Sequence, residues 1–424
     1  MVAAREDNRA LVILANFVSP LTVDLRAASV PRRWSEQAPR KIWLTRPGHV
    51  LLVPLPLSES FRRYAFGRLG MSEDSVTVVT VPDIPRVPMA EAVAAHGLLE
   101  PLRALLRESP DARLLPTALD EACVALAADL GIGIEPYPAG GPSLRVVRTV
   151  ADLNTKSGFR AIATRLGIRL PDGVVCTSAN LARATDELLA AWKRVVVKPD
   201  RSAGGHGLRF VTRDDRAAAT PPTAGERWVV EQYVDHNRAV SAQGHCAPDG
   251  VSVPFDGEMR MSGGSFAGYR SPLHDVPGVA RAELATWTLA LGRHLAAEGY
   301  RGPFSLDAVC APDGTLHALE CNVRRTATTT PHVLVTRLTG NPASAWSTGT
   351  IRTDPPCPFD AVAERLIATR LDFRPEAGQG VIIYTDRPVD GVGWRYVAMA
   401  PDHDGLTELE TRLTASFGGD DAGG

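Results

Sequence analysis

Lysine is scarce in this sequence. Only four of its 46 basic residues are lysines, namely Lys41, Lys156, Lys193 and Lys198, and all the others are arginines. These counts indicate a bias that replaces lysine by arginine. A lysine that is kept against this bias can do what an arginine cannot, such as placing a compact point charge on a phosphate. We therefore treat the four lysines as candidate functional residues, with chance retention as the alternative.

The sequence also lacks the features of several protein classes. Its six cysteines form no CxxC pair, which argues against a zinc site and against a disulfide framework. The formal net charge is −2, so a general electrostatic affinity for nucleic acid or for an anionic membrane is not expected. The apolar run near the N-terminus is short and follows acidic residues, unlike a signal peptide or a membrane span. We expect a cytoplasmic protein.

The length of 424 residues and the hydrophobic content of 44% are sufficient for two or three domains. Residues 1–145 alternate between strand-like and helix-like segments, which predicts an α/β domain with a parallel sheet. One expected helix begins after Ser58 and ends at Gly70. Another helical stretch, over residues 92–110, is expected to be interrupted at Pro101.

The rest of the chain mixes strands and helices in a way that favours α+β packing. A linker over residues 137–143 precedes a second domain, which we place at 146–345. A small C-terminal α+β domain is expected over 346–424, and its glycine-rich end at 418–424 is expected to be disordered.

A hairpin over residues 304–322 carries the clearest chemical signal. The Asp-Gly pair at 313–314 is typical of a two-residue turn, and such a turn places Asp307 directly opposite Glu320. Asn322 then lies on the same face of the hairpin. Facing carboxylates repel each other unless a cation lies between them, and these oxygen ligands suit Mg²⁺ shared with substrate phosphates. The alternative is a solvated polar face that nearby arginines compensate.

A second signal lies at residues 195–208, where a β-branched run ends at Lys198 before a loop with three glycines. This order is the reverse of a P-loop, in which the lysine follows the glycines. A glycine loop can bring backbone N–H groups close to phosphate oxygens, although glycine also favours an ordinary hairpin turn. Glu231 lies in a later strand that is either an adenine-binding edge or a plain sheet strand.

Taken in order, these features resemble the ATP-grasp superfamily over residues 150–340: Lys156 before a helix, Lys198 before its loop, Glu231 in a strand, and the acids of the late hairpin. The resemblance implies a pre-ATP-grasp α/β domain, an ATP-grasp core of two α+β subdomains and a small C-terminal α+β domain. It also implies that ATP and Mg²⁺ bind between the two subdomains.

The resemblance assigns roles to individual residues. The two lysines of the core would contact the α- and β-phosphates, and the loop 202–207 would close over the β- and γ-phosphates. Glu231 and the backbone that follows it would hold the adenine. Asp307, Glu320 and Asn322 would bind two Mg²⁺ ions, with Glu320 bridging them. The nucleotide-binding residues implied are Lys156, Lys198, Ser202, Gly204, Gly205, Gly207, Glu231, Gln232 and Val234.

One position departs from the superfamily pattern. Many members carry an acid for the ribose shortly after the adenine strand, but here Arg238 occupies that position. Asp235 or Asn237 can take over this contact, so the ribose-binding residue is left open.

Two further segments concern the substrate. The run ECNVRR at 320–325 resembles the E-x-N-x-R pattern of ATP-grasp carboxylate–amine ligases, so Arg324 is expected to hold a developing oxyanion or a substrate carboxylate. For Arg325, which has the opposite strand parity, a surface charge is favoured.

The glycine-rich stretch 257–272 is expected to be a substrate lid that carries Arg260, with a simple connection as the alternative. The candidate catalytic residues are Arg324, Lys198 and Arg260.

Nearly the whole chain resembles the peptide ligases of pheganomycin- and resorcinomycin-type antibiotic biosynthesis, which combine a pre-ATP-grasp segment, an ATP-grasp core and a small C-terminal domain. This resemblance implies ATP-dependent amide bond formation through an acyl phosphate, with amino acid and peptide substrates. A phosphotransferase on the same fold and a non-catalytic nucleotide-binding regulator are the alternatives. A homodimer is compatible with the sequence, which does not name either substrate.

Overall fold

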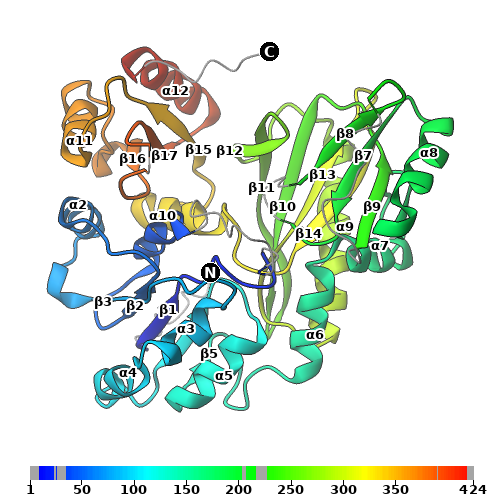
Figure 1. Ribbon diagram of the computed structural model, residues 1–424. Coiled ribbons are helices and arrows are strands. Elements are labelled where there is room, and N and C mark those ends of the chain that lie inside the picture. Colours follow the sequence, from blue (N-terminus) through cyan, green and yellow to red (C-terminus); the bar gives the residue numbers. More distant parts are fainter. Residues whose placement is uncertain are drawn as a thin grey trace.

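The described residues form three β-sheets with helices packed around them (Figure 1). The structure is a computed structural model. It describes residues 9–22, 25, 35–202, 207–215, 227–388 and 390–417. Gly204, Gly205 and the glycine-rich end at 418–424 lie outside the described residues. The expected mixture of α/β and α+β architecture is confirmed, whereas the exact domain limits stay predictions.

The N-terminal part is built on a five-stranded parallel sheet in the order β3-β2-β1-β4-β5. Its central strands are short apolar runs that are buried between helices, as the alternating sequence pattern predicts. The elements of this part are β1 (Leu11–Leu14), η1 (Ala38–Leu44), β2 (Val50–Val53), α2 (Glu59–Leu69), η2 (Glu73–Ser75), β3 (Thr77–Thr80), α3 (Met89–Ala95), α4 (Leu99–Leu106), β4 (Arg113–Pro116), α5 (Glu121–Leu130) and β5 (Gly133–Ile134).

Local capping chemistry sets the helix limits in this part. The Ser58 side chain accepts a hydrogen bond from the Phe61 N–H, and Gly70, with φ of 67°, ends α2 as predicted. The stretch at 92–110 is interrupted at Gly97, which has φ of 69°, and not at Pro101. Pro101 lies in the first turn of α4, where its missing N–H costs no helical hydrogen bond.

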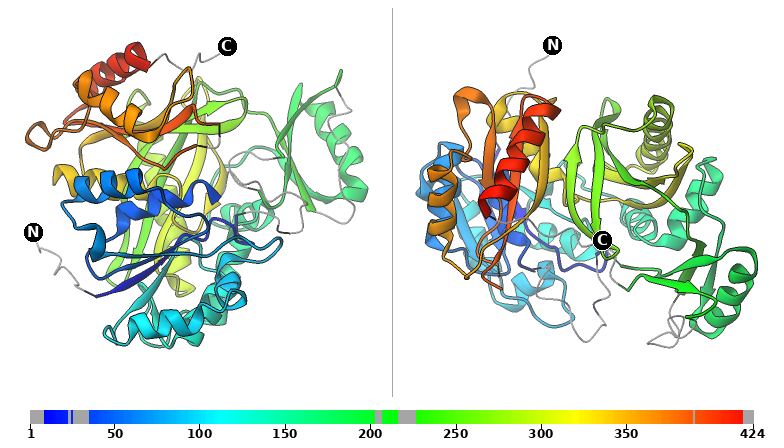
Figure 2. Two further views of the ribbon diagram at one scale, coloured as in Figure 1. Left: turned by 60° about the vertical axis from the view of Figure 1, so that its left-hand side comes forward. Right: turned by 90° about the horizontal axis from the view of Figure 1, so that it is seen from above.

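A four-stranded antiparallel sheet, in the order β6-β9-β7-β8, stands out from the rest of the protein (Figure 2). One face of this sheet packs on α8, with Val195, Val197 and Val230 in its core. Lys198 and Glu231 lie on the opposite face, because side chains alternate along a strand. The elements of this part are α6 (Leu144–Leu153), α7 (Lys156–Arg165), β6 (Gly173–Thr177), η3 (Ser178–Asn180), α8 (Leu181–Ala191), β7 (Arg194–Pro199), β8 (Arg209–Thr212) and β9 (Arg227–Gln232).

The third sheet has eight antiparallel strands in the order β14-β13-β10-β11-β12-β15-β17-β16. Helix α9 covers its first strands, and Leu291 packs there with Phe304 and Leu306. The C-terminal strands complete the same sheet through the pairing of β12 with β15. The elements are β10 (Arg238–Ala247), β11 (Gly250–Ser262), β12 (Ser265–Ser271), α9 (Gly278–Ala297), β13 (Gly302–Cys310), β14 (Leu316–Asn322), α10 (Thr329–Thr339), β15 (Ala345–Arg352), α11 (Phe359–Ala368), η5 (Pro375–Ala377), β16 (Gly380–Ile383), β17 (Gly393–Ala400) and α12 (His403–Phe417).

The predicted hairpin is present as β13 and β14, but its turn differs from the expected two-residue turn. The Ala311 N–H donates to the Thr315 carbonyl oxygen, so the turn has three residues and ends on Gly314 with φ of 87°. A β-bulge between Asp307 and Ala308 then shifts the register back by one residue. The two differences offset each other, and Asp307 does lie opposite Glu320.

The predicted lid at 257–272 is not a loop, since most of it belongs to β11 and β12. Its glycines allow close packing within the sheet. A Cβ atom on Gly257 would lie 2.3 Å from the carbonyl oxygen of Arg270, and one on Gly268 would lie 2.2 Å from that of Thr348. Only the glycines at 263–264, with φ of 55° and 79°, form the turn between the strands.

His49 gives the N-terminal part a predicted sensitivity to acid. Its Nδ1 accepts a hydrogen bond from the Arg46 N–H, and burial, together with the charge of Arg46, lowers the pKa of His49 to about 4. The folded protein therefore favours the neutral ring. This stability is complete above the unfolded pKa near 6.5 and is lost as the pH falls toward 4.

The free energy of unfolding of the wild type should fall between pH 7.5 and pH 5, in part because His49 becomes protonated on unfolding. In His49→Gln we expect this fall to be smaller by about 2 kcal/mol. Urea unfolding at the two pH values measures this difference. His96→Gln, which changes an exposed histidine of the same part, is the control. Equal pH dependence in wild type and His49→Gln would contradict the burial argument.

Candidate functional site

The facing acids of the β13–β14 hairpin lie in a polar, partly buried site. The Ser241 Oγ donates to Asp307 Oδ1 at 2.7 Å, and the Asn322 Nδ2 donates to Asp307 Oδ2 at 3.0 Å. Burial and the nearby charge of Glu320 raise the pKa of Asp307 to about 7. The repulsion that the sequence predicts between these two acids is thus present in the fold.

Cations converge on Glu320. Burial by itself raises the pKa of this acid, but Lys156, Lys198 and Arg324 together outweigh burial and lower it. The Lys156 Nζ lies 3.4 Å from Glu320 Oε2. The hairpin acids therefore face positive charges that come from α7, from β7 and from the end of β14.

The residues present at the hairpin fit a divalent cation that is shared with phosphate. Two facing carboxylates and an amide provide hard oxygen ligands, and their mutual repulsion is the expected state of a pair that a cation would neutralise. Across the described ranges, no group of three or more His, Cys, Asp or Glu side chains could hold a metal alone. A metal at this hairpin would therefore take further ligands, such as the Asn322 amide, water or substrate oxygens.

Lys198 and Glu231 form a buried ion pair on the inner face of the four-stranded sheet, with side chains only 6% and 2% exposed. Arg160, from α7, binds the other oxygen of Glu231 at 2.9 Å. Lys156 donates to the Ser202 Oγ at 3.0 Å, so the start of the glycine loop lies beside the hairpin acids. These contacts bring together residues that are far apart in the sequence.

The strand predicted to hold adenine offers one backbone donor. The N–H groups of Gln232 and Tyr233 are used by the carbonyl oxygens of Asp172 and Arg194, at 2.7 and 3.0 Å. Within the described residues, the N–H of Val234 has no acceptor. Val234 is therefore the position from which this strand can donate to a ligand.

The glycine loop is described only at its two ends. Ser202 contacts Lys156, and Gly207 has φ of 76° with its Cα close to Pro199, where a Cβ atom would lie 3.0 Å from the Pro199 Cγ. The predicted roles of Gly204 and Gly205 lie outside the described residues.

Arg324 is held at the rim of the hairpin. Its Nη1 donates to the Asn154 Oδ1, and burial lowers its pKa, although Glu320 and Asp307 oppose that shift. Arg325 is not the surface charge that strand parity favoured. Its Nη1 donates to the Pro116 carbonyl oxygen at 3.0 Å, against the N-terminal part. A cavity of about 20 Å³, enough for one water molecule, borders both arginines.

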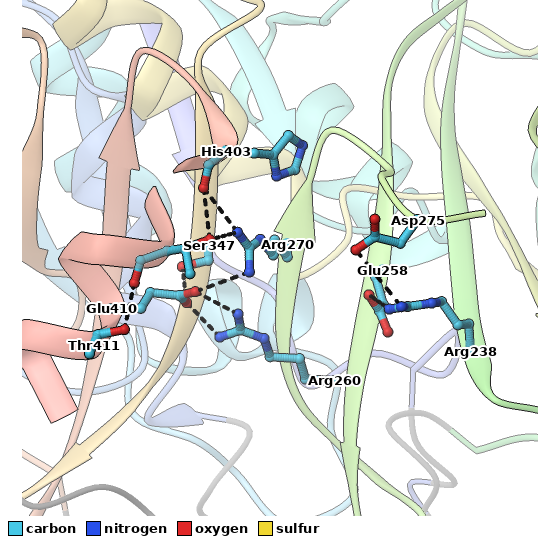
Figure 3. A network of polar contacts seen from close by, with 10 residues as sticks. Arg238, Glu258, Arg260, Arg270, Asp275, Ser347, His403, Glu410 and Thr411 are labelled. Carbon is cyan, nitrogen blue, oxygen red and sulfur yellow. Dashed lines mark hydrogen bonds and ion pairs between the residues drawn. The ribbon is translucent and has the colours of Figure 1, made fainter. Parts of the chain in front are cut away.

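Arg260, a predicted catalytic residue, is engaged elsewhere (Figure 3). Its Nη1 and Nη2 bind the two oxygens of Glu410, in α12, at 2.6 and 2.8 Å. The Ser347 Oγ donates to the same carboxylate at 2.6 Å, and Arg270 lies 3.6 Å away. A catalytic role for Arg260 stays a prediction, and the mechanism proposed below does not use it because both terminal nitrogens are occupied.

We expect Glu410→Gln to lower the free energy of unfolding by about 2 kcal/mol, because it leaves two partly buried arginines without their shared carboxylate. This value is smaller than for a fully buried pair, since the Arg260 side chain is 36% exposed. Chemical unfolding measures the effect, and Glu408→Gln, at an exposed position of the same helix, is the control. Equal stabilities of the two variants would show that the network contributes nothing.

The sequence analysis missed residues that orient the site. Arg160 fixes Glu231, Asn154 fixes Arg324, and Ser241 fixes Asp307. A usable signal existed only for Asn154, a polar residue directly before the helix that Lys156 opens. Arg160 lies in an expected helix, but the sequence does not show which strand that helix faces. Ser241 lies in a strand whose pairing with the strand of Asp307 was not predicted.

Family models match both ends of the chain. Residues 38–132 match the model described as the Pre ATP-grasp domain, and residues 361–413 match the PGM1 C-terminal domain. A curated relative, the L-propargylglycine–L-glutamate ligase of Streptantibioticus cattleyicolor, is 27% identical over 257 residues, which is 54% of this chain and 51% of the relative. The match thus spans about half the length of that relative.

Solved structures match almost the whole chain at low sequence identity. The L-amino acid ligase from Bacillus licheniformis is 13% identical with a TM-score of 0.55, covering 96% of this chain and 98% of that one. N5-carboxyaminoimidazole ribonucleotide synthetase from Thermus thermophilus is 14% identical with a TM-score of 0.60, covering 97% and 99%. A biotin carboxylase complex from Campylobacter jejuni is 12% identical with a TM-score of 0.60, covering 96% of this chain and 91% of that one. The chain therefore has the fold of these solved structures and a Pre ATP-grasp match in its N-terminal part, so the resemblance read from its sequence is confirmed.

Proposed function

We propose that this protein is an ATP-dependent carboxylate–amine ligase that joins the carboxylate of an amino acid or derivative to the amine of an amino acid or peptide. One observation carries the proposal: Lys156, Lys198 and Arg324 converge on Glu320, directly opposite Asp307. Such a set of cations and hard oxygen ligands suits phosphoryl transfer from a nucleotide to an acid.

The nucleotide would lie between the four-stranded sheet and the hairpin. Lys156 and Lys198 would neutralise the α- and β-phosphates, and the loop at 202–207 would cover the β- and γ-phosphates. The N–H of Val234 would donate to the adenine edge, since its neighbours Gln232 and Tyr233 already have acceptors. Glu231 would act by holding Lys198 in place.

Asp307, Glu320 and Asn322 would hold Mg²⁺, which when bound supplies charge neutralisation at the phosphates that Lys156 and Lys198 also contact. The raised pKa of Asp307 fits this role, because a free acid pair without a cation favours the protonated form.

The reaction would proceed in two steps. The substrate carboxylate, ionised at neutral pH, attacks the γ-phosphate and gives an acyl phosphate and ADP. The unprotonated amine then attacks the acyl carbon and releases phosphate. Arg324 would hold the reacting carboxylate and then stabilise the developing oxyanion, while the site excludes water from the reactive intermediate.

The comparisons support this reaction class. The curated relative is a ligase whose printed name joins two amino acids, and one structural neighbour is an L-amino acid ligase. Other neighbours were solved with ADP or ATP bound. None of the described helices is long and apolar enough to cross a membrane. A cytoplasmic location and a homodimer stay predictions from the sequence.

Trapping with hydroxylamine tests the proposal. The protein is incubated with ATP, Mg²⁺, hydroxylamine and a panel of amino acids and derivatives, and ADP and products are measured by mass spectrometry. A ligase yields an acyl hydroxamate with the correct acid and an amide when an amine replaces hydroxylamine.

Two other results would contradict the proposal. A stable phosphorylated product in place of the hydroxamate would indicate a phosphotransferase. ATP binding without ADP release for every acid in the panel would indicate a nucleotide-binding regulator.

A further inference from the structure

Four cationic side chains gather where η1, the end of β14 and the C-terminal strands meet. We call Arg40, Lys41, Arg325 and Arg395 the cationic cluster. Arg40 is 4% exposed and Lys41 is 0% exposed. Helix α10, which follows the hairpin, packs against η1 and brings Thr330 to this place.

Among the residues that the structure describes, the two buried members of the cluster have no counter-ion. Lys41 Nζ has one hydrogen-bond partner, the Thr330 Oγ1 at 3.2 Å. Arg40 and Lys41 both lie against the Phe17 ring, at 4.5 and 5.1 Å from its centroid. Within the described ranges, Arg40 Nε has no hydrogen-bond partner, and neither side chain forms an ion pair with an acid.

The surrounding charges make this arrangement unfavourable without a ligand. Burial, then Arg40 and Arg325, lower the pKa of Lys41 well below its ordinary value. Burial and Arg395 also lower the pKa of Arg40, to about 10, against an opposite effect of Tyr384. The acid Glu36 acts on Arg395. Buried charges are normally paired, so these cations are suited to an anion that the described residues do not supply.

Polar contacts connect the hairpin acid Asp307 with Thr326, which is close in sequence to the residue that contacts Lys41. Asp307 binds Ser241, whose Oγ accepts from the Gln243 Nε2 at 3.1 Å. The Gln243 Oε1 accepts from the Thr326 Oγ1 at 3.0 Å, four residues before the Thr330 that contacts Lys41. The cluster is therefore close in sequence to the hairpin acids, through Arg325 and Thr330, and it does not include Lys156 or Lys198.

We propose that Arg40 and Lys41 bind the unreacted carboxylate of the amine-bearing substrate, a proposal that rests on the ligase function above. An amino acid that supplies the amine also carries a carboxylate, which must be held away from the site of phosphorylation. Two adjacent buried cations, with the Thr330 hydroxyl beside Lys41, provide that selectivity. The same two cations could bind a second carboxylate on the activated acid. The test therefore separates a carboxylate of the amine substrate from a carboxylate of the activated acid.

The test uses the acid and amine found in the ADP-release screen. With wild type, converting the carboxylate of the amine substrate to a primary amide is expected to raise its KM about 30-fold or more, with a smaller effect on kcat. Lys41→Met is expected to raise the KM for the free acid by a similar factor and to leave the KM for the amide nearly unchanged. Arg40→Met should act in the same direction.

Further readouts separate this role from a structural one. Hydroxamate formation without any amine substrate, and the KM for ATP, should stay within about twofold of wild type in both variants, because neither needs the acceptor. Lys41→Met should also raise the Tm, because it removes a buried charge that forms no ion pair with the described acids. Lys193→Met, which changes an exposed lysine, is the matched control.

The outcomes are distinguishable. Unchanged discrimination between acid and amide in both variants would overturn the inference while leaving the ligase function intact. A second result is that the variants no longer prefer a dicarboxylic over a monocarboxylic activated acid but still distinguish the acid from the amide form of the amine substrate. This result would show that the bound carboxylate belongs to the activated acid, and it would overturn the assignment to the amine substrate. No hydroxamate from wild type with any acid would overturn the ligase function and this inference with it. If Lys41→Met does not fold, Arg40→Met decides.

Discussion

Glu320→Gln should lower the rate of ADP formation by roughly 10³-fold or more, because charge neutralisation by a bound metal contributes several kcal/mol to such a reaction. The amide keeps the size of the side chain but removes the charge opposite Asp307. Stability should change little, since the variant loses the contact with Lys156 at 3.4 Å and also loses the repulsion between the two acids. ADP release in a coupled assay, with Tm as the measure of folding, tests this.

The matched control is Asp313→Asn, a carboxylate-to-amide change in the turn of the same hairpin. Asp313 is exposed, and its Oδ1 accepts from the Thr315 N–H at 2.9 Å, a contact that asparagine can keep. This variant should retain normal ADP formation. Turnover near the wild-type rate in Glu320→Gln would sink the metal assignment and, with it, the proposed chemistry.

Lys198→Met should raise the KM for ATP about 30-fold or more, because it removes the buried charge that we propose to contact phosphate. It should also lower the free energy of unfolding by about 2 kcal/mol, since Glu231 then keeps only its contact with Arg160 at 2.9 Å. Lys193→Met, five residues earlier on the same segment, changes an exposed lysine and serves as the control.

The double variant Lys198→Met, Glu231→Gln separates the two effects. It removes the orphaned acid together with its partner, so the Tm should recover. The KM for ATP should stay high, because no cation takes the place of Lys198. If ATP affinity returned together with stability, Lys198 would be only the structural partner of Glu231.

The pairing of the hairpin acids was predictable, although the turn was not. Strand alternation and an Asp-Gly turn placed Asp307 opposite Glu320, and the structure has that pair. The three-residue turn and the β-bulge escaped prediction because a glycine-containing turn can have two or three residues, and a β-bulge depends on contacts that are distant in sequence. The prediction of this pair held because the two differences shift the register in opposite directions.

The stretch at 257–272 shows why glycine misleads a sequence-based prediction. Glycine is typical of loops, but Gly257 and Gly268 are needed where neighbouring strands leave no space for a Cβ atom. That crowding comes from residues such as Thr348, which is distant in sequence. A strand that needs glycine for packing cannot be told from a loop without its partner strands.

The scarcity of lysine was the most useful compositional signal. Three of the four lysines, at positions 41, 156 and 198, are buried in the candidate site or its cationic cluster, and the fourth, Lys193, is exposed. No comparable signal marked Arg40, because arginine is common throughout the chain. That Arg40 forms no ion pair with a described acid is a property of the folded chain alone.

The shared eight-stranded sheet limits how this protein can be dissected. Because β15 pairs with β12, a truncation that stops before residue 345 would strip a neighbour from β12 and leave its backbone groups unpaired. Such a fragment would be prone to edge-to-edge aggregation. Within the described residues, the four-stranded sheet shares no strand with the other two sheets, so no hydrogen bond between strands fixes its position relative to them.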